Sequence, residues 1–260
     1  MLAVSDSDIW EDLKFFLDTL KILPVSESLV LSENSSYCVS TNTDFENWVF
    51  DGCPEHEITP EMADMVVRFF GERGDSGEAF MWPVYADSDT NRKILALAGL
   101  VYAGDLAAMC LDPEKIALGR ENKAVRIEQV TSREDAGIWA DTAARGFGEE
   151  EASESYRKFV EALSAERERV RLYLAKYDGK YAGTFLVTDE PELMGVYYFA
   201  VSPEFRRKGI AREMMSGICS QAGRKKIVLQ STPMGRNFYG AFGFEELFRI
   251  PVYSTESDIF

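Results

Sequence analysis

Residues 200–215 read AVSPEFRRKGIAREMM, and this stretch decides how the rest of the chain is interpreted. Three consecutive cations, Arg206, Arg207 and Lys208, stand directly before Gly209. An apolar segment comes before them, and apolar residues at helical spacing follow. The first turn of a helix exposes backbone N–H groups and carries partial positive charge, so a strand that turns directly into a helix can cradle an anion. The pattern predicts an anion site, with a diphosphate favoured; a solvated basic helix start is the alternative.

Periodic patterns on both sides of this turn predict alternating strands and helices. Strands are expected at residues 124–130, 170–176, 181–188, 192–201, 226–232 and 245–253, and helices at 132–147, 152–169, 206–223 and 235–243. Asp178-Gly179 is a strong hairpin signal between two of these strands. A β-meander therefore leads into a strand–helix–strand–helix–strand run, which is typical of a mixed α/β or α+β fold.

The net charge of −16 argues against nucleic acid or an anionic membrane surface as a partner. The charge is uneven along the chain. Residues 1–122 hold 23 acidic and 8 basic side chains, a net −15, whereas residues 123–260 hold 21 and 20, a net −1. Solubility is one interpretation of this acidity. The other is that the N-terminal half presents a negative wall to a cationic substrate.

The cysteines, the histidine and the apolar runs limit the catalytic and metal chemistry that can be expected, and they favour one cellular compartment. The four cysteines, at positions 38, 53, 110 and 219, have no metal-like spacing, so free thiols in a reducing cytoplasm are expected. The one histidine, His56, leaves no His-rich zinc site and disfavours a Ser-His-Asp triad. The longest apolar run, residues 94–103, is too short to span a bilayer, and the N-terminus lacks the pattern of a signal peptide. A cytoplasmic protein without a metal is expected.

The secondary-structure pattern weakens between residues 113 and 123, which predicts a domain boundary there. Residues 1–122 would form one domain and residues 123–260 the other. A weak internal repeat supports this division: KILALAGL, residues 93–100, can be laid on NFYGAFGF, residues 237–244, with Leu95 opposite Tyr239. The N-terminal half can thus be a degenerate second copy; an unrelated α/β lid is the alternative.

Two motifs resemble the GNAT superfamily of N-acetyltransferases. Residues 206–211, RRKGIA, match its acyl-CoA pyrophosphate signature R-x-x-G-x-A, and residues 239–244, YGAFGF, look like its Y-x-x-x-G-F segment. The strand before the turn and the strand between the motifs also fit, so that the resemblance covers roughly residues 124–253. Many members carry an Asn seven residues before the tyrosine, whereas this chain has Thr232, which leaves the cofactor contacts of that loop open.

The resemblance implies a mixed, mostly antiparallel central sheet flanked by helices, with a second, smaller N-terminal α/β domain as in two-domain GNAT-like proteins. It implies acetyl-CoA as cosubstrate, held in a V-shaped split beside the strand at residues 193–201. Tyr239 would protonate the leaving thiolate, and the Val201 N–H would meet the thioester oxygen. The implied cofactor-binding residues are Phe199, Ala200, Val201, Arg206, Arg207, Lys208, Gly209, Ile210 and Ala211.

No general base is evident in the sequence. Glu190 and Glu192, where some family members keep a base, and Glu149 to Glu151 are candidates, although solvated turns explain both groups as well. Tyr197 or Tyr198 could line the acceptor site or pack in the core. Aromatic residues of the N-terminal half, Trp48 and Trp82, are candidates to line the cleft, with a core role as the alternative. Cys219 is expected to pack.

The expected function is an acyltransferase that moves acetyl from acetyl-CoA to a primary amine by direct attack. The alternative is a non-catalytic acyl-CoA-binding regulatory module. The acceptor could be a polyamine, an amino acid, a peptide N-terminus or an aminoglycoside, and its amine would be cationic. A homodimer is left open.

Overall fold

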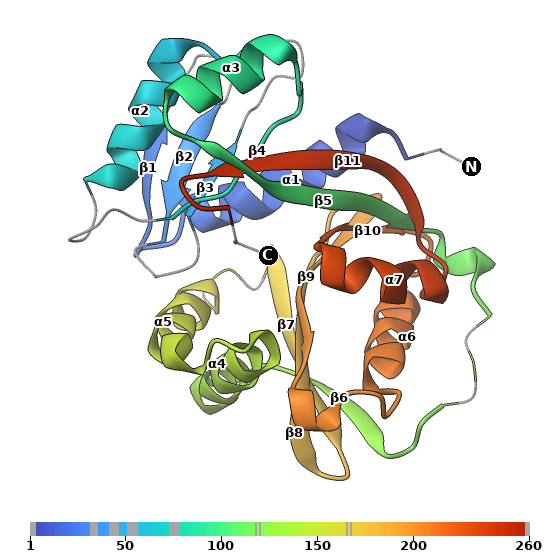
Figure 1. The fold of residues 1–260 in the computed structure, drawn as a ribbon. Helices are drawn as coiled ribbons and strands as arrows, with labels where there is room; N and C mark the ends of the chain where they lie inside the picture. Colours follow the sequence, from blue (N-terminus) through green and yellow to red (C-terminus); the bar gives the residue numbers. More distant parts are fainter. Residues whose placement is uncertain are drawn as a thin grey trace. The chain divides into compact units, whose positions relative to one another are not determined.

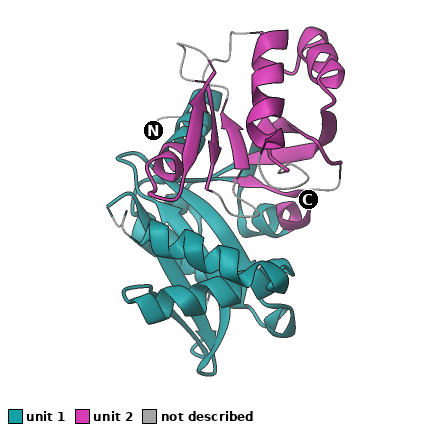
Figure 2. Ribbon diagram, turned by 90° about the vertical axis from the view of Figure 1, so that its left-hand side faces the viewer, with its two compact units in different colours: residues 1–15, 109–229, 238–246 teal, residues 16–108, 230–237, 247–260 magenta. Residues whose placement is uncertain are grey.

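The computed structural model describes residues 4–31, 36–41, 47–50, 57–72, 79–117, 119, 121–164, 166 and 168–257. His56 and Cys53 lie outside these residues. The chain divides into two compact units, each made of several segments (Figure 2). Unit 1 comprises residues 1–15, 109–229 and 238–246, and unit 2 comprises residues 16–108, 230–237 and 247–260.

Unit 1 is built on a mostly antiparallel sheet with the strand order β10-β9-β8-β7-β6. Its strands are β6 (Val125–Gln129), β7 (Val170–Tyr177), β8 (Lys180–Thr188), β9 (Leu193–Val201) and β10 (Lys226–Ser231). Only the β9–β10 pair of this set is parallel. The turn between β7 and β8 has two residues with positive φ, Asp178 at 48° and Gly179 at 79°, which confirms the hairpin predicted from Asp-Gly.

Helices cover both faces of this sheet (Figure 1). α4 (Arg133–Phe147) and α5 (Ser153–Leu163) lie on one face, and α6 (Ile210–Ala222) lies on the other. A capping box fixes the start of α4, because the Ser132 and Asp135 side chains each bond the other residue's backbone N–H. Gly148 ends α4 in the left-handed conformation at φ 80°. The mixed sheet flanked by helices that was expected for this region is confirmed.

Unit 2 holds a three-stranded antiparallel sheet of β1 (Glu27–Val30), β2 (Tyr37–Ser40) and β3 (Asn47–Phe50), with α2 (Pro60–Gly71) and α3 (Asp89–Leu97). The N-cap of α2 is Thr59, whose hydroxyl accepts a hydrogen bond from the Met62 N–H at 3.2 Å, as the sequence predicts. A second pair in this unit joins β4 (Trp82–Pro83) to the end of β11 (Glu245–Ser254). Trp82 lies in the centre of the core and is 0% exposed.

Five of the described elements contribute residues to both units: α1 (Asp6–Lys21), β5 (Val101–Leu111), β10, α7 (Pro233–Phe242) and β11. β5 begins in unit 2 and ends in unit 1, whereas β11 begins in unit 1 and ends in unit 2. The compact units therefore interleave along the chain. The domain boundary that the sequence places between residues 122 and 123 stays a prediction.

The helix–glycine–strand order of the expected internal repeat is present in both places. α3 is followed by Gly99 at φ 82° and β5, and α7 is followed by Gly243 at φ 125° and β11. The residues that the repeat aligns, Leu95 and Tyr239, are both buried. No helix among the described residues is long and apolar enough to cross a membrane.

Candidate functional site

The turn after β9 presents backbone amides at the start of α6. A short 3-10 helix, Pro203–Phe205, leads to Arg207 at φ 63° and Gly209 at φ 80°. Gly209 is the N-cap of α6, and no side chain caps the helix. Since a capping side chain would occupy the N–H groups of the first turn, its absence in this described segment leaves them for a ligand.

Asn122 holds this turn from outside. Its Nδ2 donates to the Lys208 carbonyl oxygen at 3.2 Å, and its backbone N–H donates to Glu213 Oε1 at 3.0 Å. A Cβ at Gly209 would lie 3.5 Å from Asn122 Nδ2, so there is room for one. The positive φ of Gly209 is therefore what favours glycine here.

The three cations of the turn have different surroundings. Arg206 donates from Nε to the Val201 carbonyl oxygen at 3.0 Å and from Nη2 to the Gly146 carbonyl oxygen at 2.8 Å, so its side chain ties the turn to β9 and α4. Arg207 and Lys208 are exposed, and the Lys208 Nζ lies 5.1 Å from the centre of the Phe205 ring. Arg207 and Lys208 are the cations best placed to meet an anion at the start of α6.

β9 separates from β10 before it reaches the turn. Within the described residues 193–231, their pairing runs only from Leu193–Lys226 to Gly195–Val228, although β9 continues to Val201. β9 also carries a bulge, because Tyr198 and Phe199 together stand opposite Phe185 of β8. Tyr198 has φ 50° there, in the left-handed region. The segment of β9 from residue 196 to 201 thus has an open edge, where an extended ligand could pair with its backbone.

The predicted cofactor-binding residues lie along this segment and at the helix start. Ala200 is buried against α4, where a Cβ on Gly146 would come within 2.7 Å of the Ala200 Cβ. Phe199, Val201 and Ala211 are half-buried, Gly209 is exposed, and Ile210 is buried under α6. The structure therefore brings the whole predicted set into one continuous stretch of unit 1.

Tyr239 of α7 lies beside the same segment. The centre of its ring is 5.8 Å from that of Phe199, and Phe238 and Phe244 contact it on other sides. Its side chain is 8% exposed, and burial raises the pKa of its phenol well above the usual range. Tyr239 is therefore protonated and neutral at physiological pH.

The structure separates the two neighbouring tyrosines of β9. The half-buried Tyr198 packs its ring in an aromatic cluster on α4 and α5; its ring partners are Trp139, Phe147, Tyr156 and Phe159. The half-buried Tyr197 instead donates a hydrogen bond from its hydroxyl to Asp12 Oδ2 at 2.8 Å.

Sequence reasoning missed Asp12. It belongs to α1 and is 0% exposed, on the apolar side of the helix together with Ile9, Leu13 and Phe16. A charged residue within an apolar helical stripe is the signal that could have found it, because burial of a carboxylate needs hydrogen-bonding partners. Its partner Tyr197 lies 185 positions further along the chain.

Glu190, a candidate base, lies just before β9 and is half-buried. Its Oε1 is buried and has no hydrogen-bond partner among the described residues. Burial, followed by repulsion from Asp12 and Glu11, raises the pKa of Glu190 to about 7. The other acidic candidates are exposed, namely Glu149, Glu150, Glu151 and Glu192, and Glu149 accepts a hydrogen bond from the Tyr156 hydroxyl at 2.7 Å.

Three further candidates from the sequence have core or packing positions. Trp82 is fully buried in the core of unit 2, so the idea that it lines a cleft is wrong. Trp48 is half-buried and forms a β-bridge with Met81. Cys219 is buried in α6, and burial raises the pKa of its thiol to about 11, which agrees with a packing role.

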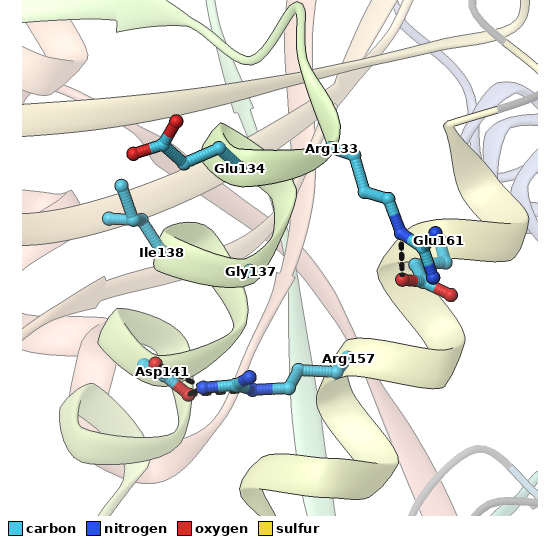
Figure 3. Close-up of a pocket in the computed structure, with 7 residues that line it drawn as sticks. All are labelled: Arg133, Glu134, Gly137, Ile138, Asp141, Arg157 and Glu161. Atoms are coloured by element: carbon cyan, nitrogen blue, oxygen red, sulfur yellow. Dashed lines mark hydrogen bonds and ion pairs between the residues drawn. The ribbon is translucent and has the colours of Figure 1, made fainter.

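A pocket lies between α4 and α5, and residues other than the candidates above line it (Figure 3). Two ion pairs span it, Arg133–Glu161 at 2.8 Å and Arg157–Asp141 at 2.7 Å. Its cations are thus already paired with carboxylates, and the pocket contains none of the residues that the motifs single out.

The split strand and the cationic helix start are features that the resemblance implies. Comparison with solved structures shows a shared fold over nearly the whole chain. A GCN5-related N-acetyltransferase from Kribbella flavida aligns with TM-score 0.67 and 14% identity, covering 95% of this chain and 94% of that one. A tandem GNAT protein from the clavulanic acid biosynthesis pathway aligns with TM-score 0.58 and 14% identity, covering 97% and 96%.

A conserved protein of unknown function from Staphylococcus epidermidis is also similar, with TM-score 0.65, 15% identity and coverage of 94% and 98%. Comparison with curated proteins gives no significant match. The family model for the acetyltransferase (GNAT) domain matches residues 138–253. Residues 138–253 therefore match the acetyltransferase domain of the GNAT family, and this match indicates acyl transfer from acetyl-CoA.

Proposed function

We propose that the protein is an N-acetyltransferase that moves the acetyl group of acetyl-CoA to a primary amine of a cationic acceptor. The observation that carries the proposal is the position of Tyr239. Its neutral phenol lies against Phe199, on the segment of β9 that has left β10. A proton donor at an open strand edge is what a leaving thiolate requires.

The residues present fit acetyl-CoA as cosubstrate, which supplies the activated thioester. The exposed Arg207 and Lys208, with the uncapped amides of α6, would hold the diphosphate. The open edge of β9 would pair with the extended pantetheine arm. Arg206 keeps the turn in place through the carbonyls of Val201 and Gly146.

The direction of the Val201 N–H follows from the strand hydrogen bonds. The Ser202 N–H donates to the Ala182 carbonyl oxygen at 2.9 Å, so it points toward β8. Successive N–H groups of a strand point to opposite sides. The Val201 N–H therefore points away from β8, toward the open edge, where it would stabilise the negative charge on the thioester oxygen during attack.

The acidity of the N-terminal half supports a cationic acceptor. Residues 1–122 carry a net charge of −15, against −1 for the rest. Such a charge raises the local concentration of ammonium-bearing molecules. Attack by a neutral amine on the thioester needs no covalent enzyme intermediate, which agrees with the unreactive surroundings of Cys219.

Two measurements test the proposal on the full chain. Acetyl-CoA should raise the melting temperature by binding the folded protein. Thiol release from acetyl-CoA should then be stimulated by at least one amine among a polyamine, an amino acid, a peptide with a free N-terminus and an aminoglycoside. Stabilisation without amine-stimulated release would instead indicate a regulatory acyl-CoA-binding module, and the absence of both would refute the proposal.

A further inference from the structure

The carboxylate of Asp12 is fixed against β9 by two hydroxyl groups. The Thr188 Oγ1 donates to Asp12 Oδ1 at 2.9 Å, and the Tyr197 hydroxyl donates to Oδ2 at 2.8 Å. Thr188 in turn accepts a hydrogen bond from the Gly195 N–H at 2.9 Å, which leaves its proton for Asp12. Both oxygens of this fully buried carboxylate are thus held as acceptors.

Gly195 makes room for this carboxylate. A Cβ at position 195 would lie 2.1 Å from Asp12 Oδ1 and 2.4 Å from Thr188 Oγ1, far inside van der Waals contact. Any side chain there would displace the carboxylate. The strand therefore lacks a side chain where the carboxylate of α1 enters, so that a group from residue 12 serves a strand more than 180 positions away.

Tyr197 connects Asp12 to the open segment of β9. It follows Gly195, the last residue paired with β10, by two positions, and it precedes Phe199 by two. Phe199 is the residue that contacts the Tyr239 ring. The bulge formed by Tyr198 and Phe199 directly follows Tyr197. Tyr197, whose hydroxyl bonds Asp12, and Phe199, whose ring contacts Tyr239, thus both belong to the segment of β9 that has left β10.

We propose that Tyr197 and Asp12 take a proton from the acceptor amine. Tyr197 contacts the amine, whereas Asp12 positions the Tyr197 hydroxyl and accepts its proton. The proposal rests on the proposed N-acetyltransferase function. The acceptor ammonium first gives one proton to Tyr197 Oη while the Tyr197 proton passes to Asp12 Oδ2. The neutral amine nitrogen then bonds to the acetyl carbon, the carbon–sulfur bond breaks, and Tyr239 gives its proton to the sulfur. The second proton that the nitrogen loses returns to Tyr239, and solvent removes the proton from Asp12.

The charged groups around Asp12 suit an ammonium substrate. Glu11 lies beside it on α1, and Glu190 lies near it before β9, with its buried Oε1 unpaired among the described residues. The opposing cations near Glu190 are Arg169 and Lys225, and Lys225 is paired with Asp189. Burial first, and the negative charges of Asp12 and Glu11 second, raise the pKa of Glu190 to about 7.

The test compares two nucleophiles on the full-length protein. n-Butylamine is a cation at neutral pH and must lose a proton, whereas hydroxylamine is weakly basic and already mostly neutral. Asp12→Asn keeps the shape of the side chain and removes its charge. We expect it to lower turnover with n-butylamine by about 10²–10³-fold and turnover with hydroxylamine by less than about 10-fold. The KM for acetyl-CoA should stay within about threefold, and the acidic limb of the kcat/KM profile with n-butylamine should be lost.

Tyr197→Phe should give the same contrast between nucleophiles, and it keeps the inference testable if Asp12→Asn does not fold. Asp18→Asn is the matched control, because Asp18 lies on the same helix and accepts a tyrosine hydroxyl, that of Tyr37, at 2.8 Å. It should leave the contrast unchanged. Equal losses with both nucleophiles in Asp12→Asn and in Tyr197→Phe would overturn this inference while leaving the proposed function intact. A wild-type protein that releases no thiol with these two nucleophiles or with any amine of the panel above would refute the proposed function itself.

Discussion

Burial decides which side chains of this domain can exchange protons. Tyr239 is held neutral in an aromatic cluster, and burial raises the pKa of Cys110 and Cys219 to about 11, so both are thiols rather than thiolates at neutral pH. Glu190 has a pKa of about 7, near physiological pH. Among these groups, only Tyr239 combines a transferable proton with a position beside the open edge of β9.

Tyr239→Phe should lower kcat by about 10²–10⁴-fold, the range of a lost general acid, and change the Kd for acetyl-CoA by less than about threefold. Steady-state kinetics and calorimetric titration measure the two quantities. Because its pKa is raised, Tyr239 should cause no loss of wild-type activity up to about pH 10. Tyr173→Phe is the control, since it removes a tyrosine hydroxyl that bonds Gln221 at 2.6 Å, away from α7. An unchanged kcat in Tyr239→Phe would remove the residue from the mechanism.

Glu190 should make stability depend on pH. Its folded-state pKa of about 7 lies above 4.5, the ordinary pKa of a glutamate side chain. The folded protein therefore binds this proton more tightly than the unfolded chain does. The stabilisation is complete below about pH 4.5 and is lost as the pH rises through about 7. The Glu190→Gln variant has no titratable group at this position, so it does not lose stability in this way as the pH rises. Urea unfolding should therefore show the variant gaining roughly 1–2 kcal/mol on wild type between about pH 4.5 and pH 8, after allowance for its partial exposure.

The exposed Glu192→Gln, two positions away, is the matched control for this pH effect and should follow wild type at both pH values. A constant difference between Glu190→Gln and wild type across the pH range would show that Glu190 titrates normally.

At the scale of elements, β9 and α6 form the candidate site because part of the backbone of each element is left unpaired. β9 keeps its hydrogen bonds to β8 through the bulge and loses those to β10 after Gly195. α6 begins at a glycine with no capping side chain. Each element thus offers backbone groups that would otherwise be satisfied within the protein.

Replacing both exposed cations, Arg207→Ala with Lys208→Ala, should weaken coenzyme A binding by about 10-fold or more, since exposed charge-assisted contacts are worth roughly 1–2 kcal/mol together. Pantetheine, which lacks the diphosphate, should bind wild type and variant equally. Isothermal titration at two salt concentrations measures both. The control is Lys180→Ala, an exposed lysine on the β7–β8 hairpin. Equal weakening for pantetheine would place the diphosphate elsewhere.

At the scale of the whole molecule, the two units cannot be cut apart at one point of the chain. Residues 1–15 and the end of β5 belong to unit 1, whereas the end of β11 belongs to unit 2 and pairs with β4 through Val252–Pro83 and Tyr253–Trp82. Each half of the sequence thus supplies a segment that the other half's unit needs. This exchange agrees with a tandem origin of the chain, which remains a proposal.

A fragment of residues 123–260 alone should therefore fail to fold cooperatively, because it lacks the α1 and β5 segments of unit 1 and leaves the end of β11 without β4. Circular dichroism should show no sigmoidal melting for the fragment. Mixing it with residues 1–122 during refolding should restore a transition. Cooperative unfolding of the isolated fragment would show that unit 1 is autonomous.

Elements with local signals were predictable from the sequence. The Asp178-Gly179 hairpin, the Thr59 and Ser132 caps and the strand–turn–helix around Gly209 all appear where the pattern places them. In each case the signal lies within a few neighbouring residues, because caps and turns satisfy backbone groups locally. The apolar run at residues 79–85 has the pattern of a strand, but it forms only the two residues of β4. Its apolar side chains are instead used in the core of unit 2.

The sequence alone indicated the class of the protein, because the motif that resembles the acyl-CoA pyrophosphate signature lies in consecutive residues, from Arg206 to Ala211. The tertiary structure alone decided that Tyr197 meets a carboxylate while Tyr198 packs against α4 and α5, and that Trp82 is buried. The bulge in β9 and the entry of α1 over Gly195 set those outcomes. Their physical reason is packing between segments far apart in the chain, for which neighbouring residues carry no signal.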